Sequence, residues 1–482
     1  MRAGSFLILV CTAAVLSGCY AMRPSEGGGK ASFDPPRRYQ AADVAVPAGY
    51  RVELVAEGFT FPTGVTFDDQ GGIYVTESGY SYGEVFTTPR LLRVVPGGAP
   101  AVVAEGGRNG PWTAATFHRG AFFVAEGGQM EGGRILRIER DGRSRALVDG
   151  LPSTGDHHTN GVVAGPDGWL YFGQGTATNA AVVGTDNAKF GWLKRFPQFH
   201  DTPCRDLTLT GANVTTDNPL GSGDATTGAF QPFGTASTAG QVVRGGFPCN
   251  GAVMRVPPDG GRAELVAWGF RNPFGLAFAP DGRLYVTDNS YDVRGSRPVF
   301  GAGDLLWAVQ PGAWHGWPDF HGDTPLYEGE RYRAPGKPAP PRLLAQHPNR
   351  PPRPAAVLGV HSSSNGFDVS RNPAFGHVGQ AFVAQFGDMT SETGKVMAPV
   401  GFRVVRVDPA TGTVTDFMLN RGGTPGPASY MNNGGIERPT AARFDPSGSA
   451  LYVVDFGVMT MGAQGPQPKP GTGALWRIVP AR

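Results

Sequence analysis

The sequence predicts an all-β fold, a six-bladed β-propeller in which each blade is a four-stranded antiparallel sheet. Three observations lead to this prediction: a repeated two-strand unit, further strands after most copies of it, and a composition rich in turn-forming residues. Gly accounts for 73 of the 482 residues, about twice its usual share, and Pro for 43. This composition favours many turns and few long helices. We expect the propeller to occupy residues 46 to 482.

The repeated unit is an apolar strand, a turn of the form Asp-x-x-Gly, and a second strand that contains Tyr-Val or Phe-Val. A clear copy is Gly275 to Asp288, which reads GLAFAPDGRLYVTD. Six copies occur, at 64–77, 114–126, 161–172, 275–288, 366–385 and 441–455. Because four-stranded units repeated around a ring leave only short, protected sheet edges, a propeller is the expected architecture.

Most copies are followed by a third strand in which basic or aromatic residues alternate with apolar ones, as in Arg134 to Ile138 (RILRI). Alternation with period two buries one face of a strand. A fourth strand follows, for example at Ala101 to Glu105. The last unit stops after its third strand, whereas Tyr50 to Glu57 is a strand without a unit. We therefore expect the two ends of the chain to pair and close the ring.

The stretch from 184 to 250 leaves one alternative open, because it could contain a seventh blade. It is rich in Gly, Thr and Asn, and it contains Cys204 and Cys249. We interpret it as a long insertion on one face of the propeller. In an oxidising compartment these two cysteines are expected to form a disulfide. A metal-binding or catalytic thiol is the alternative, although no CxxC motif or nearby His pair supports it.

The N-terminus predicts export and lipid attachment. Arg2 precedes an apolar run from Phe6 to Leu16, the pattern of a secretory signal that is too short to span a membrane. The segment Leu16-Ser17-Gly18-Cys19 resembles the bacterial lipobox, in which cleavage leaves the Cys as the new N-terminus and lipid is attached to it. We expect a signal peptide over 1–18 and a lipid anchor with a flexible tether over 19–45. A plain signal peptide with a chance Cys is the alternative.

Localisation and partners follow from the same features. Tyr20 after the Cys favours the outer membrane, with the protein facing the periplasm or the cell surface. No second stretch reaches the roughly 20 apolar residues of a membrane helix, so membrane contact is expected only through the anchor. The net charge of +2 gives no indication of a nucleic-acid partner. No pattern indicates an oligomeric state.

Polar residues just before the inner strands of the repeats are the candidates for a functional site. In a propeller these loops converge at one end of the central channel, so side chains from several blades meet there. The candidates are Arg108, Asn109, Asp156, His157, His158, Arg271, Asn272, His361 and Arg438.

Some of these segments resemble a known family. Gly150 to His157 (GLPSTGDH), followed by Gly165 to Tyr171 (GPDGWLY), is similar to the catalytic segment of soluble quinoprotein glucose dehydrogenases. So is Gly269 to Phe278 (GFRNPFGLAF), which continues to Gly303-Asp304 and Gly316-Trp317-Pro318. His361-Ser362 and Arg438-Pro439 resemble the sorbosone dehydrogenase branch. The resemblance to this glucose/sorbosone dehydrogenase family covers residues 46 to 480.

The resemblance implies an oxidoreductase that oxidises a sugar or a related alcohol, with PQQ as hydride acceptor and Ca²⁺ between the quinone and the protein. His157 would be the general base, with a pKa near the working pH, and Asp156 would orient the substrate or the base. The cofactor would be held by Arg271, Asn272, Arg438, Asn109, Arg108 and His361. The backbone carbonyls of Ser290 and Tyr291 would bind Ca²⁺. Electrons would pass to an external acceptor, because no CxxCH haem motif is present.

The chain departs from this family at three places. Ser290-Tyr291 stands where the glucose dehydrogenases have a Gly-Pro pair, and the expected Lys is replaced near Gln385-Phe386. Where the family has two Arg residues that face the cofactor, this chain has one. Because PQQ carries three carboxylates, the loss of two cations weakens its electrostatic binding unless Arg108 or Arg403 compensates.

Two other functions stay open. A propeller of this kind could be a non-catalytic cell-surface module that binds a carbohydrate or a protein, since fold does not imply activity. It could also be a Ca-dependent lactonase or hydrolase, which would need Glu, Asn and Asp side chains around the metal. Glu77 and Glu126 could contribute to such a site.

Overall fold

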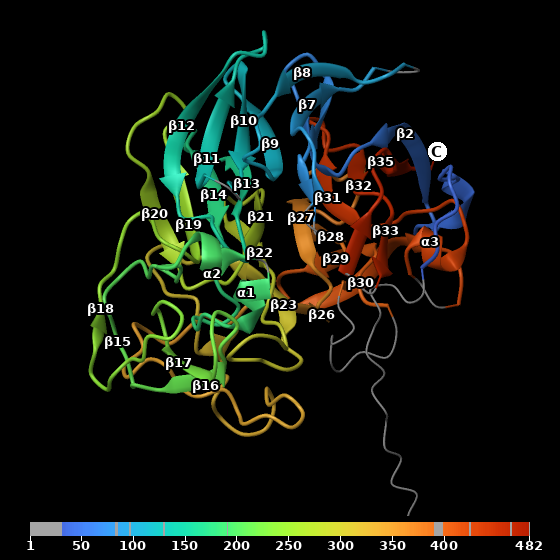
Figure 1. Ribbon diagram of the computed structural model, residues 1–482. Coiled ribbons are helices and arrows are strands. Elements are labelled where there is room, and N and C mark those ends of the chain that lie inside the picture. The colour runs from blue at the N-terminus through green and yellow to red at the C-terminus, as the bar shows by residue number, and fades with distance from the viewer. Residues whose placement is uncertain are drawn as a thin grey trace, which may run out of the picture.

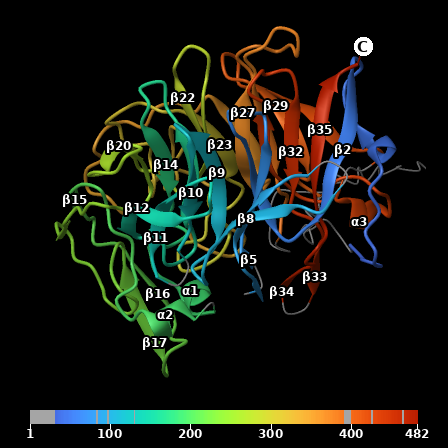
Figure 2. The same ribbon diagram turned by 90° about the horizontal axis from the view of Figure 1, so that it is seen from above.

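The computed structural model describes residues 31–81, 85–95, 98–128, 131–189, 191–389, 399–423, 426–462 and 465–481. Six antiparallel blades form a propeller, which confirms the fold predicted from the repeats. Figures 1 and 2 show the blades following one another around the molecule in chain order. The signal peptide and Cys19 lie outside the described residues. Within those residues no helix is long and apolar enough to cross a membrane.

Each blade begins with its inner strand, and blades 1 to 5 continue outward in chain order. Blade 1 is formed by β3 (Pro62–Phe67), β4 (Ile73–Glu77), β7 (Arg90–Arg93) and β8 (Ala101–Glu105). Blade 2 is formed by β9 (Trp112–His118), β10 (Ala121–Glu126), β11 (Gly133–Ile138) and β12 (Ser144–Leu151). Blade 3 is formed by β13 (Thr159–Ala164), β14 (Leu170–Gln174), β19 (Ala252–Val256) and β20 (Glu264–Trp268). Blade 4 is formed by β21 (Pro273–Phe278), β22 (Leu284–Asp288), β23 (Gly303–Ala308) and β26 (Ala356–Val360). Blade 5 is formed by β27 (Ser364–Val369), β28 (Ala381–Gln385), β29 (Arg403–Asp408) and β30 (Thr413–Asn420). The inner strands β3, β9, β13, β21, β27 and β31 contact one another in this order, and β31 returns to β3.

Blade 6 closes the ring by combining both ends of the chain. Its first three strands, from the inside outward, are β31 (Pro439–Phe444), β32 (Leu451–Asp455) and β35 (Gly473–Pro480). Its outer strand is β2 (Tyr50–Phe59), which pairs antiparallel with β35 along its whole length. This confirms the predicted closure, and the ring has six blades rather than seven.

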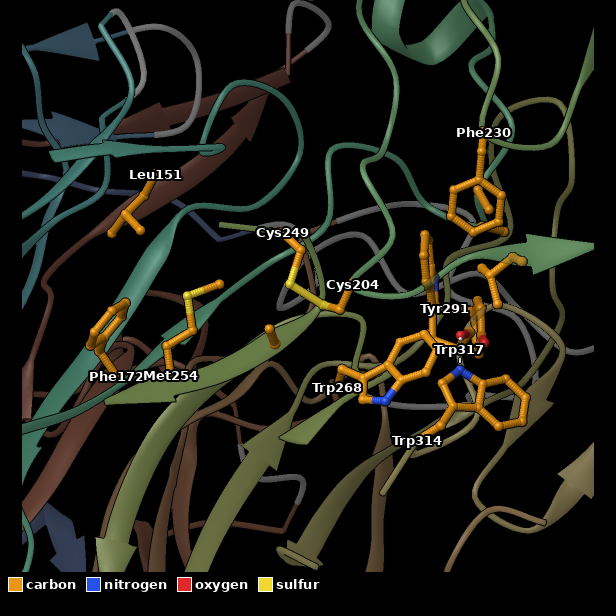
Figure 3. Close-up of a cluster of buried hydrophobic side chains, with 14 of the residues drawn as sticks. Leu151, Phe172, Cys204, Phe230, Cys249, Met254, Trp268, Tyr291, Trp314 and Trp317 are labelled. Atoms are coloured by element: carbon orange, nitrogen blue, oxygen red, sulfur yellow. Dashed lines mark hydrogen bonds between the residues drawn. A yellow bond between two sulfur atoms is a disulfide. The ribbon is translucent and has the colours of Figure 1, made fainter. Parts of the chain in front are cut away.

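The stretch between β14 and β19 is an insertion that adds no blade. It contains α1 (Thr185–Lys189), α2 (Trp192–Arg195), and the two hairpin-like sheets β15 (Leu207–Thr208) with β18 (Val242–Val243) and β16 (Asn213–Asp217) with β17 (Asp224–Gly228). The expected disulfide is present between Cys204 and Cys249. Figure 3 shows it in a cluster of buried side chains that also includes Phe172 of blade 3 and Trp317 from the β23–β26 connection.

The connections between blade strands contain short elements. They are β5 (Tyr80–Ser81) with β6 (Val85–Phe86), β24 (Phe320–His321) with β25 (Thr324–Pro325), β33 (Met459–Gly462) with β34 (Gly465–Pro468), and the helix α3 (Ala428–Met431).

The last residues of the segment 19–45, which the sequence assigns to a tether, contact the propeller. The 3₁₀-helix η1 (Ala41–Asp43) leads into β1 (Val44–Ala45), which adds a fifth strand to blade 5 by pairing with β30. Arg37 is bound as well, because its NH2 group donates to Asp455 Oδ2 at 2.5 Å. Both partners are far away in the sequence, so composition alone gave no sign of this docking.

One buried residue at the end of the second strand of each blade holds the loop before the inner strand. In blade 4, Asp288 accepts hydrogen bonds from the backbone N–H groups of Arg271 and Asn272 at 3.1 and 2.7 Å. The equivalent residues in blade order are Glu77, Glu126, Gln174, Asp288, Gln385 and Asp455. Because a buried carboxylate or amide must be hydrogen-bonded, this repeated contact fixes six loops at one end of the channel.

Candidate active site

Five of the predicted site residues gather where the loops before β13, β21 and β27 meet. They are Asp156, His157, Arg271, Asn272 and His361. Asp292, from the β22–β23 connection, links two of them. Its carboxylate accepts a hydrogen bond from Arg271 NH2 at 2.7 Å, and its Oδ1 lies 3.3 Å from His361 Nδ1. The loops of blades 3, 4 and 5 therefore converge, as the sequence predicts.

Arg294 holds this cluster together. Its guanidinium binds Asp156 Oδ2 at 2.8 Å, Asp186 Oδ2 at 2.5 Å and Asp292 Oδ2 at 2.9 Å. Asp186 belongs to α1, so the insertion contributes directly to the site. Asp186, Asp292 and Arg294 were not predicted from the sequence, because they do not precede an inner strand. The only signal was the pair of charges, Asp292 and Arg294, directly after Ser290-Tyr291.

His157 is a buried imidazole with a defined tautomer. Its Nδ1 lies 2.9 Å from the carbonyl oxygen of Thr176, which can only accept, so Nδ1 carries the proton and Nε2 carries the lone pair. Burial lowers the pKa of His157 well below its usual value, and Arg271 and Arg294 lower it further. This differs from the predicted pKa near the working pH, because the sequence does not reveal how completely the ring is desolvated. A neutral imidazole with a lone pair on Nε2 can accept a proton from a hydroxyl group.

Two buried carboxyl groups support the loop of His157. Burial raises the pKa of Asp156 to about 6, although Arg294 opposes this shift. Burial also raises the pKa of Asp201 to about 7, and Asp201 accepts hydrogen bonds from the backbone N–H of Ala177 and the hydroxyl of Thr178. The residues after β14 are therefore tied to the insertion on one side and to the His157 loop on the other.

A row of side-chain amides connects blades 3, 4 and 5. Asn160 Nδ2 donates to Asn272 Oδ1 at 2.7 Å, and Asn272 Nδ2 donates to Asn289 Oδ1 at 2.9 Å. Asn289 Nδ2 in turn donates to the carbonyl oxygen of Ser364 at 2.8 Å. The amide of Asn272 thus links blade 3 to Asn289, which continues the row to blade 5.

Ser290 and Tyr291 lie beside the same cluster and are buried. The backbone N–H of Ser290 donates to Asp304 Oδ1 at 3.0 Å, and the hydroxyl of Tyr291 donates to the carbonyl oxygen of Phe320 at 2.8 Å. Ser290 Oγ and His361 Nε2 are buried and have no hydrogen-bond partner among the described residues. A buried polar atom without a partner costs about 1–3 kcal/mol, so these two atoms mark a place where a ligand could complete the site.

No cluster of three or more His, Cys, Asp or Glu side chains suited to a metal ion is found in the described ranges. The backbone carbonyl oxygens of Ser290 and Tyr291, which the resemblance implies as Ca²⁺ ligands, belong to the same segment as Asp292 and Arg294. Hard cations such as Ca²⁺ accept ligands of this kind.

Four predicted candidates lie outside this cluster, and three of them make other contacts. Arg438 is completely buried, donates to the carbonyl oxygen of Asp388 at 3.2 Å, and stacks on two aromatic rings. Asn109 donates to Glu126 Oε1 at 2.9 Å, and Arg108 is exposed. His158 is buried and packs edge-on against Tyr80. Arg403, considered as a substitute cation, pairs with Asp416 at 3.0 Å.

The structure is similar to solved structures of sugar dehydrogenases. The holo form of the pyranose dehydrogenase PQQ domain from Coprinopsis cinerea matches with a TM-score of 0.54 at 15% identity, over 92% of this chain and 98% of that chain. The calcium structure of a Trichoderma reesei protein of carbohydrate-active enzyme family AA12 matches with a TM-score of 0.52 at 16% identity, over 92% and 98%. The PQQ-bound form of an aldose sugar dehydrogenase from Streptomyces coelicolor has a TM-score of 0.49 at 16% identity, over 90% and 99%.

Sequence comparison adds nothing to this result. No protein-family model matches the chain, and the search of curated proteins finds no match. The predicted resemblance to quinoprotein sugar dehydrogenases is thus confirmed at the level of structure. The chain is a six-bladed β-propeller whose fold is similar to that of the pyranose dehydrogenase PQQ domain and of the AA12 protein.

Proposed function

We propose that the protein is a PQQ-dependent dehydrogenase that oxidises a sugar or a related alcohol, with His157 as the general base. The observation that carries the proposal is the buried, neutral His157, whose Nε2 lone pair lies in a loop cluster with the guanidinium groups of Arg271 and Arg294. The fold shared with PQQ-binding sugar dehydrogenase domains supports the same function.

The residues present fit an anionic quinone together with a divalent cation. His361 Nε2 and Ser290 Oγ, which have no hydrogen-bond partner within the described ranges, offer polar contacts, and the carbonyls of Ser290 and Tyr291 would offer oxygen ligands for Ca²⁺. When bound, PQQ supplies a two-electron acceptor for the hydride of the substrate.

The charge balance of the cluster determines how such a cofactor would be held. Arg271 and Arg294 are already paired with the carboxylates of Asp156, Asp186 and Asp292. The cluster therefore has no excess of positive charge for the carboxylates of PQQ. Bound Ca²⁺ would be the largest positive charge in the site, so we expect PQQ binding to depend strictly on Ca²⁺.

Residues of this chain accept the hydroxyl proton of the substrate and stabilise the charge that results. His157 Nε2 accepts the hydroxyl proton of the substrate, while the Thr176 carbonyl keeps the ring in one orientation. The charge that develops on the imidazole is stabilised by the nearby Asp292 carboxylate. Arg294 is a positioning residue, because it ties Asp156 beside His157 to the insertion. Electrons leave to an external acceptor.

A cofactor titration tests the proposal most directly. Purified protein is titrated with PQQ by quinone absorbance, with and without Ca²⁺, and dye reduction is then measured with a panel of aldoses. We expect micromolar or tighter binding only with Ca²⁺. The variant His157→Ala should keep PQQ binding and lose dye reduction by about 10²–10⁴-fold, the usual contribution of a general base.

A matched control uses another His that lies outside the site. His377, in blade 5, has φ of 54° and contacts Arg406, and Asn tolerates this left-handed conformation. His377→Asn should leave dye reduction unchanged. Absence of PQQ binding at micromolar concentration with Ca²⁺ would reject the proposal in favour of a non-catalytic propeller that binds a carbohydrate or a protein.

The lactonase alternative gains no support from the two glutamates considered for it. Glu77 pairs with Arg90 at 2.6 Å, and Glu126 accepts hydrogen bonds from Asn109 and Trp112. Both carboxylates are engaged in contacts that hold blade loops.

We also propose that the protein is exported and anchored to the outer membrane through lipid on Cys19. The lipobox-like sequence before Cys19 supports this proposal. Cys19→Ala should move the protein from the membrane fraction to the soluble fraction, as measured by immunoblotting after cell fractionation. Membrane association that survives the substitution would contradict lipid anchoring at this residue.

A further inference from the structure

A cavity of about 260 Å³ lies at the end of the central channel opposite the candidate active site. All six inner strands line it, through residues near their C-terminal ends. The candidate active site lies at the N-terminal ends of the same strands. Because each strand has six or seven residues that rise about 3.3 Å each, the two sites are about 15–20 Å apart.

Arg443 of β31 reaches across this end of the channel. Its NH2 group donates to Thr116 Oγ1 of β9 at 3.2 Å. β31 and β9 are not neighbours in the ring, since β3 lies between them and contacts both. The guanidinium of Arg443 is therefore held inside the channel rather than between two blades.

The guanidinium of Arg443 makes no ion pair with a carboxylate in the part of the chain that the structure describes. The acid beside it, Asp368, accepts the backbone N–H of Phe444 at 3.0 Å and lies 3.6 Å from Arg371 NH1. Burial lowers the pKa of Arg443, and Asp368 only partly offsets this. With two guanidinium groups and one carboxylate, the lining carries a net positive charge.

The rest of the lining is largely apolar. Phe67, Phe117 and Phe278 come from three different blades, and Val163 and Leu276 also line the cavity. An aromatic and aliphatic wall around one cation suits a ligand that has an anionic head and an apolar body.

We propose that this Arg443 cavity binds a small organic carboxylate, with the carboxylate on the guanidinium of Arg443 and the apolar body against the phenylalanine rings. This site is separate from the proposed dehydrogenase site, and its occupation requires neither PQQ nor Ca²⁺.

Isothermal titration of the protein without PQQ or Ca²⁺ tests the proposal, with benzoate as the probe. Benzamide has the same shape without the charge, and inorganic phosphate has charge without the apolar body. We expect benzoate to bind at least tenfold more tightly than either. Arg443→Met should weaken benzoate at least tenfold, whereas Arg283→Met, at an exposed turn of blade 4, should leave it unchanged.

A second variant tests whether binding needs the guanidinium of Arg443 itself or its contact with Thr116. Thr116→Val removes the hydroxyl that Arg443 contacts but keeps the guanidinium, so it should retain benzoate binding within about threefold, a change worth less than 1 kcal/mol. Unchanged binding in Arg443→Met, phosphate as tight as benzoate, or no binding of benzoate up to millimolar concentration would overturn the proposal. None of these results bears on PQQ-dependent dye reduction, so the two proposals fail separately.

Discussion

Blades 4 and 6 contain the same loop anchor but use it differently. In each blade two residues precede a proline that starts the inner strand, Pro273 in blade 4 and Pro439 in blade 6. An Asp at the end of the second strand accepts both of their backbone N–H groups and the Nε1–H of a Trp on the third strand. The pairs are Asp288 with Trp307 at 3.1 Å and Asp455 with Trp476 at 3.3 Å.

The arginines of the two loops differ by one position relative to the proline. Arg271 stands two residues before Pro273, and its side chain reaches Asp292 in the candidate site. Arg438 stands directly before Pro439, and its guanidinium is buried between Phe386 and Phe402, at 4.9 and 4.8 Å from the ring centroids. An Arg near the start of an inner strand is therefore not by itself a site residue, because its offset from the proline decides where the side chain goes.

Exchanging each arginine for methionine should separate a role in cofactor binding from a role in stability. This is the largest effect that we expect. Arg271→Met should weaken PQQ binding in the presence of Ca²⁺ by about 100-fold, or about 2.7 kcal/mol, because a charge-assisted contact and the order of Asp292 are lost. Arg438→Met should keep PQQ affinity within about threefold. It should instead lower the free energy of unfolding by about 2–4 kcal/mol, because buried carbonyl oxygens lose their donor. The measurements are the quinone titration and chemical denaturation.

The comparison between the two variants is the test. Equal losses of PQQ affinity would show that both arginines contact the cofactor and that the offset from the proline has no functional meaning.

The position occupied by Arg271 in blade 4 is occupied by Glu437 in blade 6. Its carboxylate accepts hydrogen bonds from the backbone N–H and the hydroxyl of Ser429 at 2.8 and 2.7 Å. Burial raises the pKa of Glu437 to about 7, although Arg37 opposes the shift. Blade 6 thus contains a titrating group where blade 4 contains a permanent cation.

This difference predicts a pH-dependent stability that Glu437→Gln removes. A carboxyl group with a raised pKa binds its proton more tightly in the folded state, so folding stability falls as pH rises from about 4.5 to about 7 and is constant above that. At pH 8 the Gln variant should be more stable than the parent protein by about 1–3 kcal/mol, and at pH 4 the two should be equal. Denaturant titrations at these pH values measure the difference. The same advantage at both pH values would show that Glu437 does not titrate in this range.

The sequence was sufficient for the features that repeat or that lie next to a strand. The blades follow from period-two alternation, and the ring closure follows from an unmatched strand near the N-terminus and a last unit that lacks its fourth strand. The convergence of His157 with Arg271 follows from the placement of both residues before inner strands. Each of these inferences uses only local pattern and the geometry of a ring.

The contacts that depend on long-range packing could not be predicted in this way. Arg294 binds Asp186 in the insertion, 108 residues earlier in the chain, and no periodicity connects the two. The guanidinium of Arg438 lies against the rings of Phe386 and Phe402, which belong to another blade, instead of in the candidate site. The complete desolvation of His157, which lowers its pKa, also depends on elements far apart in the sequence.

The smallest expected effect tests whether the shared anchor is energetically equivalent in the two blades. Trp307→Phe and Trp476→Phe each remove one N–H donor from a buried Asp that keeps its backbone donors. Because the ring is largely replaced and one hydrogen bond is lost, each variant should lower the free energy of unfolding by about 1–2 kcal/mol. The difference between them should be within about 0.5 kcal/mol in denaturant titrations. A much larger loss in Trp476→Phe would mean that blade 6, which joins the two ends of the chain and binds Arg37 through Asp455, relies on this anchor more than blade 4 does.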